Sequence, residues 1–223
     1  HHAGEVPHQQ RAALVGRRGC AWPQVLFTNI SSVAVGFAMY GMSLIPMQIL
    51  MAPAQTGYGM GRSMIQAGLL LAPSGFVMYL FSSVGARLSA ARGPRTSLAT
   101  GIVVIGCGYV SALFLRDQPW EITLATVFIG AGIGIAYAAM PALIMGAVPI
   151  TETAAANGLN ALMRSMGTSL SSAVVSVVLA HEVVHVGPVT LPSSHGFTVA
   201  LLLSVGAALV ALAFSLAIPR PRP

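Results

Sequence analysis

The sequence alternates between long apolar segments and short connectors that carry most of its charges. The apolar segments lie near residues 24–52, 64–86, 97–115, 122–147, 157–181 and 197–218. Each is long enough to cross a hydrocarbon core, which takes about 20 helical residues. None has the strict alternation of a β-strand, and backbone inside a membrane must form its hydrogen bonds within helices or closed barrels. The pattern therefore predicts an all-α membrane protein with six transmembrane helices in one bundle.

The two ends of the chain differ from this six-span unit. Residues 1–21 are polar, and we expect them to form a cytoplasmic tail or a loop between spans. The six-span unit then covers residues 22–219, and residues 220–223 form a second cytoplasmic tail. Because the chain begins with His1 rather than methionine, we expect a piece of a longer protein or a processed product.

Composition supports a membrane protein. Hydrophobic residues make up 55% of the chain and charged residues 7%, whereas soluble domains carry about 25% charged residues. The net charge of +6 would suit nucleic acid, but the arginines lie in connectors between apolar runs, as they do in membrane proteins. We therefore exclude nucleic acid and expect a lipid bilayer as a partner. The absence of lysine, with abundant Ala, Gly and Val, indicates a GC-rich bacterial genome and hence the plasma membrane.

The arginines also predict an orientation. If the N-terminus is cytoplasmic, the cytoplasmic side holds Arg11, Arg17, Arg18, Arg87, Arg92, Arg95, Arg164, Arg220 and Arg222, and the outside holds Arg62 and Arg116. Cytoplasmic loops of membrane proteins are enriched in arginine and lysine. Both termini are therefore expected in the cytoplasm.

Several polar residues lie inside the apolar segments. They are Asn29, Tyr40, Gln48, Gln66, Tyr79, Tyr137, Asn157, Asn160 and Arg164, and none is an acid. Ionisable groups inside a membrane usually serve function. Two interpretations of Arg164 stay open: it snorkels to the headgroups, or it has a role at a gate or substrate site.

The motif "HEVVH", residues 181–185, matches the pattern of zinc proteases. On a helix, His181 and His185 would share one face, with Glu182 as the base and His195 as a third ligand. The motif lies at the end of a span, however, just before Gly187. We keep an intramembrane zinc protease as the alternative from another class, and expect no metal, cofactor or enzymatic activity.

Four longer stretches carry a family resemblance, which covers residues 20–220. They are "PMQILMAPAQTGYGMGRSMIQAGLLLAPSG", "GARLSAARGPR", "YAAMPALIMGAVPITETAAANGLNALMRSMGTSLSSAVVS" and "FTVALLLSVGAALVALAFSLAIPRPRP". Together they resemble the C-terminal half of a major facilitator superfamily transporter, and most of all the fourteen-span drug:proton antiporters of bacteria. The resemblance implies proton-coupled efflux of small amphipathic compounds or drugs, with an N-terminal transporter half as the missing partner. A solute-specific exporter and a non-catalytic membrane scaffold are further alternatives.

The resemblance also assigns candidate residues. It implies a substrate cavity or gate formed by residues in the first and fifth spans: Tyr40, Gln48, Asn157, Asn160 and Arg164. The family's cytoplasmic loop motif corresponds to Gly85, Arg87, Arg92, Gly93 and Arg95. Ala90 and Ala91 stand where that motif has an acid and an arginine, so the resemblance preserves the loop's topological role and not its charge relay.

Overall fold

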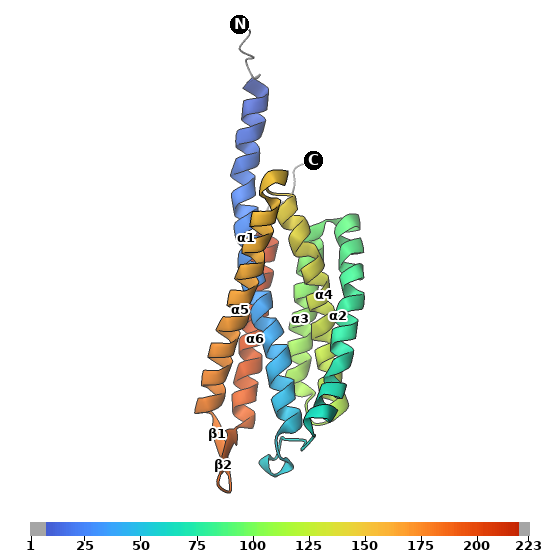
Figure 1. The fold of residues 1–223 in the computed structure, drawn as a ribbon, viewed down its shortest axis with the longest axis vertical. Helices are drawn as coiled ribbons and strands as arrows, with labels where there is room; N and C mark the ends of the chain where they lie inside the picture. The colour runs from blue at the N-terminus through green and yellow to red at the C-terminus, as the bar shows by residue number, and fades with distance from the viewer. Residues whose placement is uncertain (1–7, 219–223) are drawn as a thin grey trace.

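The computed structural model describes residues 8–218, and the side chains of residues 23–218. Six long helices run roughly parallel to one axis (Figure 1). They are α1 (His8–Met51), α2 (Met64–Arg92), α3 (Pro94–Phe114), α4 (Pro119–Met145), α5 (Thr153–His181) and α6 (Ser194–Ala217). Short 3₁₀ turns, η1 (Ala54–Thr56) and η2 (Ile150–Glu152), and a hairpin of β1 (Val183–Val186) and β2 (Val189–Pro192) complete the described residues. All six helices are long and apolar enough to cross a membrane, α1 through Pro23–Met51.

The helix boundaries follow from local sequence. Ser63 and Gln66 form a reciprocal capping box at the start of α2, with hydrogen bonds of 3.3 and 3.2 Å, which satisfies two otherwise free N–H groups. Gly93 separates α2 from α3 with φ 88°, a conformation that favours glycine. Pro94 and Pro119 each occupy the first turn of a helix, where the missing N–H costs nothing.

The helices pack as two related groups of three. On one side of the bundle α4 packs against α2 and α3, and on the other α1 packs against α5 and α6 (Figure 1). Contacts of α1 with α4 and of α3 with α6 join the two groups. The first three helices thus repeat in the last three with reversed direction, so that α1 corresponds to α4 and α5 to α2. This is the arrangement of an inverted repeat.

Glycine allows α1 and α5 to cross with their backbones in contact. A Cβ atom at Gly36 would overlap the carbonyl oxygen of Arg164, and one at Gly167 would overlap that of Val33. Small residues are the usual means of close helix approach in membranes. The crossing therefore fixes the backbone of Arg164 against α1.

Some boundaries differ from the sequence prediction. The helix α1 begins at His8, inside the stretch expected to be a tail or loop. The Gln, Ala and Arg residues there have high helix propensity. Similarly, α2 continues to Arg92, so Gly85 and Arg87 are helical and Gly93 alone forms the turn. The connector after α5 forms a hairpin that the sequence analysis did not predict. Residues 1–7 and 219–223 of the expected tails lie outside the described residues.

Candidate substrate site

A line of polar side chains runs along α5 on the side that meets α1. Asn160, Arg164, Thr168 and Ser172 follow one another at four-residue spacing. Residues four apart lie on the same face of a helix. Leu159, Leu162, Met166 and Leu170, by contrast, expose their side chains. The helix α5 therefore has a polar stripe and an apolar face, and we use the name polar stripe for these four residues.

Asn160 anchors the stripe to α1. Its side chain is 3% exposed, and its Nδ2 donates to Asn29 Oδ1 at 2.9 Å and to Ser32 Oγ at 2.7 Å. Asn29 is buried as well. Buried amides need such partners because an unsatisfied polar group costs about 1–3 kcal/mol. The α1–α5 interface thus holds a hydrogen-bonded amide pair at one end of the polar stripe.

Arg164 lies deep in its helix. At 1.5 Å per residue it stands about 16 Å from the start of α5 and about 25 Å from its end. Its guanidinium carbon lies 4.6 Å from the centroid of the Tyr137 ring in α4, a cation–π distance. Its Nη1 lies 3.5 Å from Asn160 Oδ1. The guanidinium is thus directed at neighbouring side chains of the bundle, not at an end of the helix.

Beyond Arg164 the stripe borders an open hollow of about 390 Å³. Tyr40, Thr168, Ser169, Ser172 and Ala173 line it. Ser172 Oγ donates to Tyr40 Oη at 3.0 Å, which joins the two helices across its floor. The hollow therefore combines hydroxyl groups with one aromatic ring.

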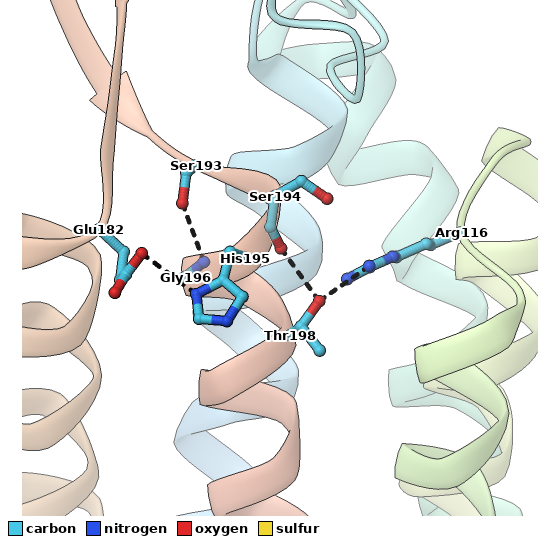
Figure 2. A network of polar contacts seen from close by, with 7 residues as sticks. All are labelled: Arg116, Glu182, Ser193, Ser194, His195, Gly196 and Thr198. Carbon is cyan, nitrogen blue, oxygen red and sulfur yellow. Dashed lines mark hydrogen bonds and ion pairs between the residues drawn. The ribbon is translucent and has the colours of Figure 1, made fainter.

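The structure overturns the geometry required by the zinc-protease alternative. The helix α5 ends at His181, Glu182 follows it, and His185 lies in β1, so His181 and His185 share no helical face. The chain leaves the helix because Gly187, with φ 62°, forms the hairpin turn. Figure 2 shows His195 Nδ1 paired with Glu182 at 3.1 Å. Among the side chains of residues 23–218, no group of three His, Cys, Asp or Glu could hold a metal ion.

A family model for the Major Facilitator Superfamily matches residues 4–172. The chain belongs to this superfamily. The match covers most of the chain, including α1–α4 and the polar stripe. The protein is therefore a multi-pass membrane protein of a transporter family and not an enzyme. Its six-helix bundle with an internal inverted repeat corresponds to one half of a major facilitator fold.

Two curated relatives share part of the sequence. Both are named Multidrug resistance protein Stp, from Mycobacterium tuberculosis strains CDC 1551 / Oshkosh and ATCC 25618 / H37Rv. Each is 26% identical over 147 residues, which is 66% of this chain and 26% of the relative. The chain thus spans about a quarter of the length of these relatives.

Two of the predicted cavity residues, Asn157 and Gln48, form no side-chain hydrogen bond with the polar stripe among residues 23–218. Asn157 Nδ2 donates to the Thr153 carbonyl oxygen of its own helix at 3.0 Å. Gln48 is half-buried and forms no side-chain hydrogen bond within residues 23–218. Tyr40, Asn160 and Arg164, by contrast, each contact a side chain of a neighbouring helix.

The residues of the predicted loop motif have separate positions. Gly85 is buried against Ile135 of α4, and its carbonyl oxygen accepts a hydrogen bond from Ser97 Oγ at 2.9 Å. Arg87 and Arg92 are exposed near the end of α2. Arg95 Nε donates to the Ser215 carbonyl oxygen at 3.3 Å, and its Nη2 donates to that of Leu216. A cation at the C-terminus of a helix interacts favourably with the helix dipole, so Arg95 joins the start of α3 to the end of α6.

Sequence reasoning did not assign four residues to the site. Asn29, Ser32, Tyr137 and Ser172 complete the contacts of the polar stripe. Asn29 and Tyr137 carried a signal, since each is polar within an apolar span. The two serines carried almost none, because serine is common at helix contacts in membranes.

Proposed function

We propose that the protein is the C-terminal half of a carrier that exports small amphipathic compounds, including drugs, across the bacterial plasma membrane in exchange for protons. The observation that carries this proposal is the hollow lined by Tyr40, Thr168 and Ser172, which opens on the α1–α5 surface of a major facilitator bundle. Carriers of this fold bind substrate between two six-helix halves. The name of the mycobacterial relatives supports drugs as substrates.

The partner half is needed for two reasons. A single half offers only one wall of a central cavity. In addition, the acids of residues 23–218, namely Asp117, Glu121, Glu152 and Glu182, all lie at helix ends or in connectors. Because proton-coupled carriers keep an ionisable group inside the membrane, the proton-carrying residue is assigned to the missing N-terminal half.

The test is transport by reconstituted protein. Proteoliposomes receive the 223-residue chain alone, or the chain together with its N-terminal half, and an imposed proton gradient drives efflux of a panel of fluorescent amphipathic dyes. We expect efflux only with both halves, and none when a protonophore removes the gradient. Gradient-driven efflux by the chain alone would show that it is self-sufficient, and efflux that ignores the protonophore would exclude proton coupling.

The same proposal places both termini in the cytoplasm. Arg87, Arg92 and Arg95 lie at one end of the bundle, whereas Arg62 and Arg116 lie at the other, and positive residues favour the cytoplasmic side. We expect a membrane-impermeant maleimide added to intact cells to label Thr190→Cys in the hairpin and not Ala90→Cys in α2, in a background without Cys20 and Cys107. Both positions are exposed. The opposite labelling would reverse the topology.

A further inference from the structure

Arg164 holds a positive charge within a membrane span and contacts no negative group in residues 23–218. The one ion pair of these residues joins His195 and Glu182 near the hairpin. The contacts of the Arg164 guanidinium are the face of the Tyr137 ring at 4.6 Å and the amide oxygen of Asn160 at 3.5 Å. A guanidinium carries five N–H donors, and the second contact is at the limit of a hydrogen bond. Most of its donor capacity therefore remains for a ligand.

Neighbouring contacts hold the guanidinium in place. Asn160 is fixed by its bonds to Asn29 and Ser32, and the Arg164 backbone is fixed by the close approach of Gly36. The guanidinium carbon lies over the Tyr137 ring, a contact that uses none of the N–H groups as hydrogen-bond donors to an oxygen. A planar donor group held in this way fits a planar acceptor with two oxygens, and a carboxylate is that acceptor.

The hollow lies further along α5 than this arginine. Thr168, in its lining, follows Arg164 by one helical turn, about 6 Å along the axis, on the side away from Asn160. The Tyr40 ring and the hydroxyls of Thr168, Ser169 and Ser172 offer a surface for an aromatic body with polar substituents. A molecule with a carboxylate a few bonds from an aromatic group would satisfy both parts.

We propose that Arg164 is the recognition residue for the carboxylate of an anionic amphipathic substrate whose body occupies the hollow lined by Tyr40, Thr168 and Ser172. This inference rests on the proposed transport function and narrows its substrate class. It assigns Asn160 and Tyr137 as positioning residues, since each acts through the guanidinium.

Equilibrium binding of two matched probes tests the assignment without any gradient. Dansylglycine carries the carboxylate, and dansylglycinamide has the same body without the charge. Dansyl fluorescence is titrated with the purified 223-residue chain in nanodiscs of neutral lipid. We expect the carboxylate to bind at least about tenfold more tightly, because a hydrogen bond to a charged group stabilises by more than one decade of affinity. Equal binding of the two probes, or binding of neither, would overturn the proposal.

Variants assign the preference to Arg164. Arg164→Gln should reduce the preference to less than about twofold, and Arg164→Lys should keep part of it because the ammonium retains the charge but not the fork of donors. The matched control is Arg116→Gln, which removes an arginine in the connector after α3. Arg116 donates to Thr198 Oγ1 at 2.8 Å (Figure 2), and its loss should leave the preference unchanged. Circular dichroism and gel filtration verify folding, and Arg164→Lys supplies the result if Arg164→Gln fails to fold. An undiminished preference in Arg164→Gln would contradict the assignment.

A second measurement separates the substrate from a carboxylate of the carrier itself. The titrations are repeated with the N-terminal half present. A preference that persists supports the substrate assignment, whereas its disappearance would show that a side chain of the other half occupies Arg164. Gradient-driven efflux of the amide without any preference would overturn this inference and leave the proposed transport function intact.

Discussion

The inverted repeat relates the helix pair α1–α5 to the pair α4–α2, yet the two pairs differ in chemistry. Both use glycine to bring backbones together: Gly36 and Gly167 in the first pair, and Gly134 against the Met78 carbonyl oxygen in the second. Only α1–α5 adds a buried amide pair and an arginine. In α2–α4 the buried polar residue Ser74 donates to Leu71 in its own helix at 2.6 Å.

This difference separates packing from function. Small residues set the distance between helices in both pairs, so they account for the fold and not for the site. The polar groups of α1–α5 have no counterpart in α2–α4, where exposed residues such as Phe76 and Tyr79 are aromatic. An asymmetric site on a nearly symmetric framework supports our proposal that α1–α5 faces the transport path, and the following substitutions test that proposal.

The largest effect is expected from Arg164→Ala in the carrier assembled with its N-terminal half. Transport should fall at least about tenfold, because the substitution removes hydrogen bonds to a charged group. Ser82→Ala in α2 is the comparison, since Ser82 Oγ donates only to the Tyr79 carbonyl oxygen of its own helix, at 2.7 Å. It should change transport less than twofold. Equal losses in gradient-driven efflux would remove the distinction between the two pairs.

Glycine substitutions should affect the two pairs alike. Gly167→Ala and Gly134→Ala place a Cβ atom onto a carbonyl oxygen, and we expect each to lower the free energy of unfolding by about 1–3 kcal/mol. Gly158→Ala in α5 and Gly68→Ala in α2 are matched controls with open space around the glycine. They should be neutral or stabilising by up to about 1 kcal/mol. Thermal unfolding in detergent measures all four variants. A strong effect at one helix pair only would contradict the expectation that the two pairs pack in the same way.

A smaller effect, confined to the α1–α5 pair, is expected from Asn160→Ala. It leaves Asn29 Oδ1 without its 2.9 Å donor, and hydrogen bonds between membrane helices contribute about 1 kcal/mol. Ser74→Ala in α2 removes a bond within one helix and should cost less, although Ser74 is buried too. The same unfolding experiment compares the two. A larger loss for Ser74→Ala would place the more important polar contact in α2–α4.

Hydrophobic patterning was sufficient to predict the six helices, since a membrane span leaves few alternatives for an apolar segment of this length. It located the polar residues of α5 as well, because Asn160 and Arg164 interrupt apolar sequence. It could not predict that Arg164 meets Tyr137, or that Gln48 lies apart, since both depend on how helices far apart in sequence rotate against each other. The zinc motif misled for a related reason: His181 and His185 have helical spacing only while the helix continues, and Gly187 follows too closely.

The smallest expected effect concerns the connectors at the ends of these helices. Tyr58, in the α1–α2 connector, donates its Oη hydrogen to the Pro192 carbonyl oxygen of the hairpin after α5, and its ring packs at 5.3 Å against Phe197. In the repeat, the α4–α5 connector (residues 146–152) corresponds to the α1–α2 connector, and the α2–α3 turn at Gly93 corresponds to the hairpin. No such bond joins residues 146–152 to Gly93 among the described contacts.

Burial raises the pKa of Tyr58 above its ordinary value of 10.0, and a hydrogen bond with Thr56 opposes this in part. Because the folded protein favours the neutral phenol, stability is fully present below pH 10 and is lost as the pH rises through the raised pKa. Tyr58→Phe should cost about 0.5–1.5 kcal/mol at neutral pH, and the difference between wild type and variant should shrink above pH 10. Thermal unfolding between pH 8 and 11 measures this difference, with Tyr79→Phe as a control for loss of one exposed phenol on α2. A difference that stays constant across this range would show that Tyr58 does not couple the two connectors.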